Sequence, residues 1–202
     1  VEFKNGATMK IMTGGSGGKR GDKKRSAFTS RVLVITEVDG FDERGTGSDE
    51  ADKISQLEAR VLAYGSRARI YKECTVTTKD GRIWRDYETG TCSRITLKCP
   101  CCGSHVMPER DHLRGWQDSE TELQADRESA YSCPDCGTQW SEKQRKQAAN
   151  DAILLHRGQQ IDSEGFLSGE MKETYTLGFR VTAVDNMLLS AGDVGMAEWK
   201  AI

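Results

Sequence analysis

The stretch Arg31-Val32-Leu33-Val34-Ile35-Thr36-Glu37 decides the fold. A short continuous apolar run that ends in polar residues is typical of a strand buried on both faces of a parallel sheet. Its last residues would lie at the carboxyl edge of the sheet, where α/β proteins build their sites. Residues 48–64 then predict a helix capped by Ser48, with an apolar face formed by Ile54, Leu57, Val61 and Leu62. Residues 67–73 form a second candidate strand, so the order strand, helix, strand predicts an α/β core.

Composition and charge narrow the class of protein. The chain has 202 residues, 36% hydrophobic and 30% charged, which is typical of a soluble globular protein with room for two units. No stretch approaches the roughly 20 apolar residues that span a bilayer, so we expect no transmembrane helix. The first residue is Val1, and we expect the chain to begin inside a domain. A net charge of -2 gives no global attraction for DNA phosphates, so any nucleic-acid contact must come from local basic patches.

The amino-terminal region predicts a hairpin followed by a basic loop. Residues 1–13 read as a hairpin because Asn5-Gly6 is a strong turn dipeptide. Residues 14–31 read as a flexible loop, and they could either follow a nucleic-acid backbone or be merely solvated. The candidate nucleic-acid contacts in this loop are Lys19, Arg20, Lys23, Lys24 and Arg25.

The same loop contains a glycine-rich run that resembles a phosphate loop. The motif needs glycine, four further residues and then Gly-Lys-Ser/Thr. Thr13 stands where the first glycine belongs, and Arg20 follows Lys19. We therefore expect no phosphate-binding loop here.

The later part of the chain changes character twice. From Thr91, clusters of cysteine, proline and glycine bracket a highly charged middle, and regular helical signals return at Ser141. Ser141 and Gln144 fit a capping box that opens a helix running to about Arg157. A strand over 178–184 would return to the core. The predicted domains are an α/β core part at 1–90, a metal module at 91–140, and a helical connector with a returning strand at 141–202.

Two cysteine knuckles define the metal module. Cys99-Pro100-Cys101-Cys102-Gly103 and Cys133-Pro134-Asp135-Cys136-Gly137 share the pattern Cys-Pro-X-Cys-Gly. Four thiolates at this spacing predict a closed tetrahedral zinc site, which is structural because it has no open position for catalysis. The predicted ligands are Cys99, Cys102, Cys133 and Cys136.

Other uses of these cysteines stay open: an iron cluster, redox thiols or plain core residues, with His105 or His112 as a substitute ligand. Cys74, Cys92 and Cys101 lie outside the ligand pattern. Paired knuckles without a secretion signal favour a reducing compartment, the cytoplasm.

The order of features along the chain resembles the large subunit of tailed-phage terminases, in the family typified by the lambda packaging enzyme. Residues 32–37 resemble a Walker B strand, which ends in carboxylates beside magnesium and the attacking water. The further matching stretches are Gln56-Leu57-Glu58-Ala59-Arg60, Ile70-Tyr71-Lys72-Glu73-Cys74-Thr75-Val76-Thr77, Gly81-Arg82-Ile83-Trp84-Arg85-Asp86-Tyr87-Glu88-Thr89-Gly90, the two knuckles and Leu177-Gly178-Phe179. This resemblance implies a partial P-loop NTPase core of the ASCE type with an inserted four-cysteine zinc ribbon. Residues 1–90 would be the C-terminal part of the ATPase core, and residues 91–140 would be the zinc-ribbon insert.

The resemblance also implies roles for residues at the predicted sheet edge. Glu37 takes the place of the catalytic glutamate, Thr36 that of the usual magnesium-shell aspartate, and Asp39 is a further candidate for the metal. The segment 73–77 matches the coupling motif, which makes Thr75 and Thr77 candidate sensors of the γ-phosphate. The chain departs from the family at Thr36, and at Cys74-Thr75-Val76, where a Ser-Thr-Pro-like run is common.

The function implied is that of a motor that uses ATP and Mg²⁺ to drive double-stranded DNA into a procapsid in the host cytoplasm. The implied partners are the terminase small subunit and the portal or procapsid, with a homo-oligomeric motor and no membrane. The family's phosphate loop and nuclease domain match nothing in this sequence, so we expect the 202 residues alone to be inactive as an ATPase. The alternatives are a non-catalytic zinc-ribbon module that binds nucleic acid or protein, and an inactive remnant kept for assembly contacts.

Overall fold

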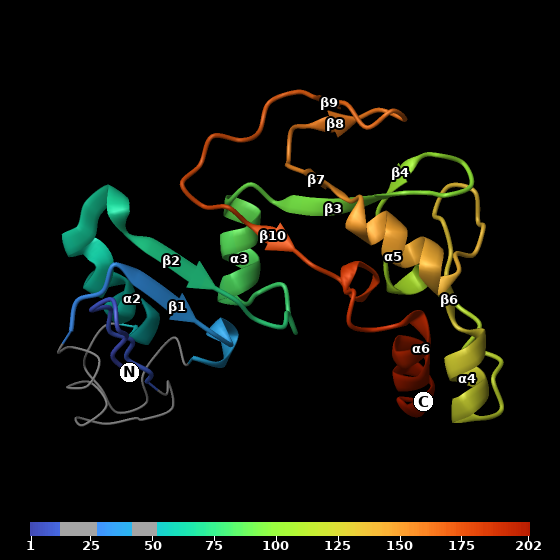
Figure 1. Cartoon of the computed structure of the whole chain (residues 1–202), viewed down its shortest axis with the longest axis horizontal. Helices are drawn as coiled ribbons and strands as arrows, with labels where there is room; N and C mark the ends of the chain where they lie inside the picture. Colours follow the sequence, from blue (N-terminus) through green and yellow to red (C-terminus); the bar gives the residue numbers. More distant parts are fainter. Residues whose placement is uncertain (13–27, 42–51) are drawn as a thin grey trace. The chain divides into compact units, whose positions relative to one another are not determined.

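A computed structural model describes residues 1–12, 28–41 and 52–202 as a mixed α/β chain (Figure 1). The backbone divides into two compact units, Val1–Arg85 and Asp86–Ile202. In these three ranges no helix is long and apolar enough to cross a bilayer. Ser48 and the five basic residues of the loop lie outside the described residues. The division of the chain at 91 and 140 stays a prediction.

The first unit contains the parallel strand pair that the sequence predicts. β1 (Val32–Ile35) pairs with β2 (Arg69–Lys72) in a register that places Ile35 opposite Lys72. The ladder continues past the strand ends, because the Glu73 amide donates to the Ile35 carbonyl (3.0 Å) and the Val38 amide to the Glu73 carbonyl (3.1 Å). Residues just beyond the two strands are therefore held side by side.

The prediction that β1 is buried on both faces is wrong for the described residues. Leu33 and Ile35 are buried, whereas Val32 is 46% exposed and Val34 is 62% exposed. The helical segment between β1 and β2 packs on one face of the strand pair alone, and its side chains join Leu33 and Ile35 in one apolar cluster. Within the described ranges no buried cluster forms on the opposite face, so the strand shows the alternation of a half-buried strand.

The predicted helix begins at a different capping residue and changes from α to 3₁₀ geometry midway. α2 (Lys53–Glu58) starts at Asp52, whose carboxylate accepts from the Ser55 amide at 2.9 Å, and the chain continues as the 3₁₀ helix η2 (Ala59–Arg67). The predicted apolar face is confirmed at its buried members Ile54, Leu57 and Val61. Leu62 was placed wrongly, since it is 74% exposed. A 3₁₀ helix has three residues per turn, so Leu62 rotates away from the expected face while Val61 stays on it.

The turn of the predicted amino-terminal hairpin is confirmed, and the hairpin itself is short. One antiparallel bridge joins Glu2 to Thr8, and Gly6 has a φ of +80° that suits glycine. The Asn5 side chain accepts from the Ala7 amide at 3.1 Å, as asparagine does in turns.

The second unit is organised around β3 (Ser93–Lys98). β10 (Phe179–Arg180) pairs with it in parallel, whereas β4 (His105–Val106) and β7 (Ile153–Leu155) pair with it in antiparallel fashion. β10 covers only two residues of the predicted 178–184 strand, and the chain then turns into the 3₁₀ helix η4 (Ala183–Asp185).

The helix after Ser141 is confirmed at its start and was predicted too long. Ser141 and Gln144 form the expected capping box at the start of α5 (Glu142–Asn150). The predicted end near Arg157 is wrong, because residues 153–155 form β7 against β3. Pairing with a neighbouring strand outweighs the local helical preference there.

The remaining elements are short. In the order of the chain they are η1 (Val38–Gly40), α3 (Arg82–Thr89), η3 (Arg110–His112), β5 (Leu113–Arg114), α4 (Glu122–Glu128), β6 (Ala130–Tyr131), β8 (Gln160–Ile161), β9 (Leu167–Ser168) and α6 (Ala191–Lys200). β5 pairs with β6, and β8 pairs with β9.

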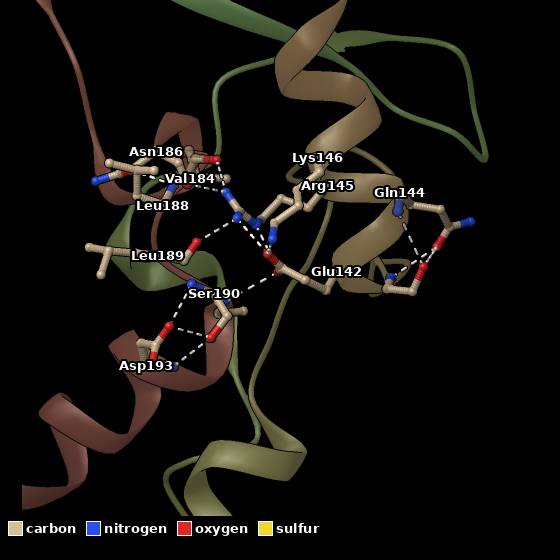
Figure 2. Close-up of polar contacts among 12 residues, drawn as sticks. Glu142, Gln144, Arg145, Lys146, Val184, Asn186, Leu188, Leu189, Ser190 and Asp193 are labelled. Carbon is tan, nitrogen blue, oxygen red and sulfur yellow. Dashed lines mark hydrogen bonds and ion pairs between the residues drawn. The ribbon is translucent and has the colours of Figure 1, made fainter.

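Arg145 on α5 ties together the segment that leads into α6 (Figure 2). The side chain is 1% exposed, and its guanidinium donates to three backbone carbonyls and to the Glu142 carboxylate. The carbonyls belong to Val184 (2.6 Å), Asn186 (3.0 Å) and Leu189 (2.6 Å). A buried charge is tolerable only when it is paired and hydrogen-bonded in this way.

We predict that Arg145→Met lowers the free energy of unfolding by about 3–5 kcal/mol, because it leaves three carbonyls without this donor and removes the buried partner of the Glu142 carboxylate. Lys146→Met is the matched control. Lys146 lies 3.5 Å from the same Glu142 carboxylate but is 45% exposed, so its loss costs at most about 1 kcal/mol. Urea unfolding followed by circular dichroism measures both. Equal losses in the two variants would show that the buried contacts of Arg145 contribute nothing beyond an ordinary surface pair.

Candidate functional site

The tip of β1 presents two polar side chains to solvent. Thr36 and Glu37 follow the strand directly, and both are exposed. Glu37 has φ 52° and ψ 50°, in the left-handed region that residues other than glycine seldom adopt. Such strain costs on the order of 1 kcal/mol and is found most often at functional sites. The backbone therefore gives Glu37 a specific, costly orientation at the carboxyl end of a parallel strand.

Cys74, at the tip of the neighbouring strand, is the residue that sequence reasoning missed. Its sulfur lies 3.7 Å from the Glu37 carboxylate and 3.4 Å from the Thr75 carbonyl oxygen. Burial raises the pKa of the Cys74 thiol, and the negative charges of Asp39 and Glu37 raise it further. The group therefore remains a protonated thiol at neutral pH, able to donate a hydrogen bond.

Thr75 and Thr77 lie in the segment that follows β2, and both side chains are exposed. Within the described residues, Cys74 rather than either threonine brings its side chain to Glu37. Whether the two hydroxyls sense a γ-phosphate stays a prediction.

Asp39 is engaged with the start of α3. One carboxylate oxygen accepts from the Ile83 amide at 2.9 Å, in the first turn of that helix. The other oxygen is buried and has no hydrogen-bond partner among the described residues. A Cβ on Gly81 would lie 2.2 Å from it, so a larger residue at position 81 would displace the Asp39 carboxylate. These contacts support an anchoring role, and a role in binding metal stays a prediction.

The two knuckles bring the four predicted cysteine sulfurs together in the second unit. Their sulfur atoms all lie within 4.8 Å of one another, with Cys99 to Cys136 at 3.8 Å and Cys102 to Cys133 at 3.9 Å. Four sulfurs about 2.3 Å from one zinc ion would be about 3.8 Å apart. The spacing therefore fits a tetrahedral metal site.

The backbone explains why the sulfurs converge. In the first knuckle, the Gly103 amide donates to the Cys99 carbonyl at 3.0 Å, and in the second the Gly137 amide donates to the Cys133 carbonyl at 3.0 Å. Both glycines have positive φ, +78° and +71°, which the turns require. The first knuckle is the turn between β3 and β4, and the second follows β6.

Exposure and thiol pKa divide the four candidate ligands into two kinds. Cys99 and Cys133 are each 2% exposed, whereas Cys102 and Cys136 are exposed. Burial raises the pKa of Cys133 to about 12, whereas hydrogen bonding with Thr138 lowers the pKa of Cys136 to about 6. Metal binding to all four sulfurs must therefore displace the Cys133 proton.

Cys101, which the pattern leaves out, and the substitute candidates His105 and His112 do not join the cluster. Cys101 is exposed, and the described group of four contains no histidine. His112 instead accepts from the Glu109 amide at 3.1 Å. Both ring nitrogens of His105 are buried and lack a hydrogen-bond partner within the described chain.

A parallel strand pair with a carboxylate at its tip, joined in one chain to a four-cysteine cluster, is consistent with an α/β ATPase part that carries a metal module. A family model described as "Phage terminase large subunit gpA, ATPase domain" matches residues 2–153. The chain belongs to this family, and so to the ATPase part of a phage DNA-packaging motor. Neither the comparison with curated protein sequences nor that with solved structures gave a match.

We predict that Cys133→Ser lowers metal content and solubility, whereas Cys101→Ser leaves both nearly unchanged. The first substitution removes a buried sulfur of the cluster and the second an exposed sulfur outside it. Elemental analysis of the two purified variants measures the difference. Equal metal loss in both would mean that the four sulfurs are wrongly chosen.

Proposed function

We propose that this chain is part of the motor subunit of a DNA-packaging terminase, where it takes part in ATP hydrolysis that moves double-stranded DNA into a procapsid. The observation that carries the proposal is the exposed Glu37 carboxylate at the tip of β1, beside the tip of the parallel strand β2. Membership of the terminase ATPase family supports it.

In this proposal Glu37 polarises the water that attacks the γ-phosphate. Thr36 offers an exposed oxygen atom, the ligand type that Mg²⁺ prefers, and would help to hold the ion in the complete ATPase. Bound Mg²⁺ would neutralise charge on the β- and γ-phosphate oxygens. Thr75 and Thr77 would report on the γ-phosphate from the neighbouring strand tip. Because the sequence has no phosphate-loop match, the lysine that cradles the triphosphate comes from elsewhere in the motor.

The four cysteines, in the same proposal, hold one structural Zn²⁺. Cys99 and Cys133 belong to the buried apolar cluster of the second unit, so the metal would stabilise that unit from within. All four positions of a tetrahedral ion would be filled by sulfur, which leaves no place for a substrate. The ion is thus structural.

The partners follow from the motor role. Double-stranded DNA would contact the basic segment that includes Lys19, Arg20, Lys23, Lys24 and Arg25. The motor would be homo-oligomeric and would act in the host cytoplasm with the terminase small subunit and the portal of the procapsid.

We predict that Glu37→Gln in the complete subunit lowers kcat for ATP hydrolysis by about 10²–10⁴ and leaves nucleotide binding intact, since it removes the water-polarising carboxylate alone. Glu2→Gln is the control, because it makes the same charge change at an exposed position in the amino-terminal hairpin, away from the predicted site. Steady-state turnover and the binding of a fluorescent ATP analogue measure the two effects.

Wild-type turnover in Glu37→Gln would defeat the proposed role of this strand. The better proposal would then be a non-catalytic metal-ribbon module, because the four-cysteine cluster alone is sufficient for that role.

We also predict about one zinc ion per molecule of freshly purified, reduced protein, and unfolding mainly within residues 91–140 on chelation. Elemental analysis gives the stoichiometry, and hydrogen exchange before and after chelation locates the unfolding. Less than about a tenth of an equivalent of zinc would contradict the metal assignment.

A further inference from the structure

The contact between Cys74 and Glu37 is set by the strand register. Ile35 lies opposite Lys72, and the backbone bonds of Glu73 to Ile35 and Val38 hold the two strand ends together, so that the Cys74 sulfur lies beside the Glu37 carboxylate. The thiol faces two acceptors, the Thr75 carbonyl and the Glu37 carboxylate. The carboxylate is charged, and a hydrogen bond to a charged acceptor is stronger than one to a neutral carbonyl.

Cys74 has a second contact of a different kind. The residue is half-buried and packs against the apolar cluster that contains Leu33, Ile35 and Val38. Its sulfur therefore has an apolar side toward the core and a polar side toward Glu37. Packing and hydrogen bonding are separable here, because one substitution can keep the volume and another the donor.

We propose that Cys74 is a positioning residue for ATP hydrolysis, which holds the Glu37 carboxylate in place by donating a hydrogen bond to it. The inference rests on the proposed function, since it assigns a use to that hydrogen bond during turnover. The backbone of Glu37 is strained, and its side chain is exposed. Because of this exposure, few other contacts restrain the side chain. A carboxylate that must polarise one water molecule loses efficiency when it is displaced by about 1 Å.

The test compares Cys74→Ser with Cys74→Val in the complete subunit. Serine keeps a donor and gives up apolar packing, whereas valine keeps apolar volume and has no donor. We expect Cys74→Val to lower kcat about tenfold with the KM for ATP unchanged, and Cys74→Ser to remain within about twofold of the wild type. Circular dichroism and zinc content confirm that both variants are folded.

The opposite order, with turnover kept in Cys74→Val and lost in Cys74→Ser, would overturn the proposal and assign Cys74 to packing. Equal turnover in the two variants would overturn it as well. A complete wild-type subunit without any ATP turnover would contradict the proposed function itself. The comparison of Cys74→Val with Cys74→Ser tests only the positioning role.

A second measurement tests the contact without any turnover. Iodoacetamide alkylates a thiolate, and the negative charge of Glu37 helps to keep Cys74 protonated. We therefore expect Glu37→Gln to raise the alkylation rate of Cys74 in the 202-residue chain. Peptide mass spectrometry measures the rate at this one cysteine. Glu2→Gln, an exposed carboxylate of the amino-terminal hairpin, serves as the control. An unchanged rate in Glu37→Gln would show that the two side chains do not interact, and would overturn the proposal.

Discussion

The parallel register of β1 and β2 is the constraint on which the candidate site depends. Leu33 and Ile35 are the buried side chains of β1, and a slip by one residue would expose both of them. Their burial therefore fixes the pairing, and the pairing brings Glu37 beside Cys74. Apolar packing inside the first unit thus determines the chemistry at the end of its strands.

The second unit depends on polar groups in its interior. Its strands contain two to six residues, too few to bury a large core by themselves. Two clusters compensate. The four sulfurs connect the β3–β4 turn with the segment after β6, and Arg145 holds the carbonyls of residues 184–189. Both are costly when incomplete, because a lone buried charge or thiolate has no water to solvate it.

Local patterns in the sequence predicted local structure well. The Cys-Pro-X-Cys-Gly repeats predicted which four sulfurs lie together, and Ser141 with Gln144 predicted the start of α5. Features that depend on distant partners were missed. The end of α5 is set by the pairing of β7 with β3, and the contact of Cys74 with Glu37 by a register that joins residues 37 positions apart. Neither leaves a periodic signal in the chain.

The central claim is that ATP is hydrolysed at the tips of β1 and β2. A structure of the complete subunit with Mg²⁺ and a non-hydrolysable ATP analogue tests it directly, through the distance between the Glu37 carboxylate and the water in line with the γ-phosphate. We predict that this distance is within hydrogen-bond reach, about 2.6–3.2 Å. A triphosphate bound away from these strand tips, or a different carboxylate holding that water, would contradict the claim.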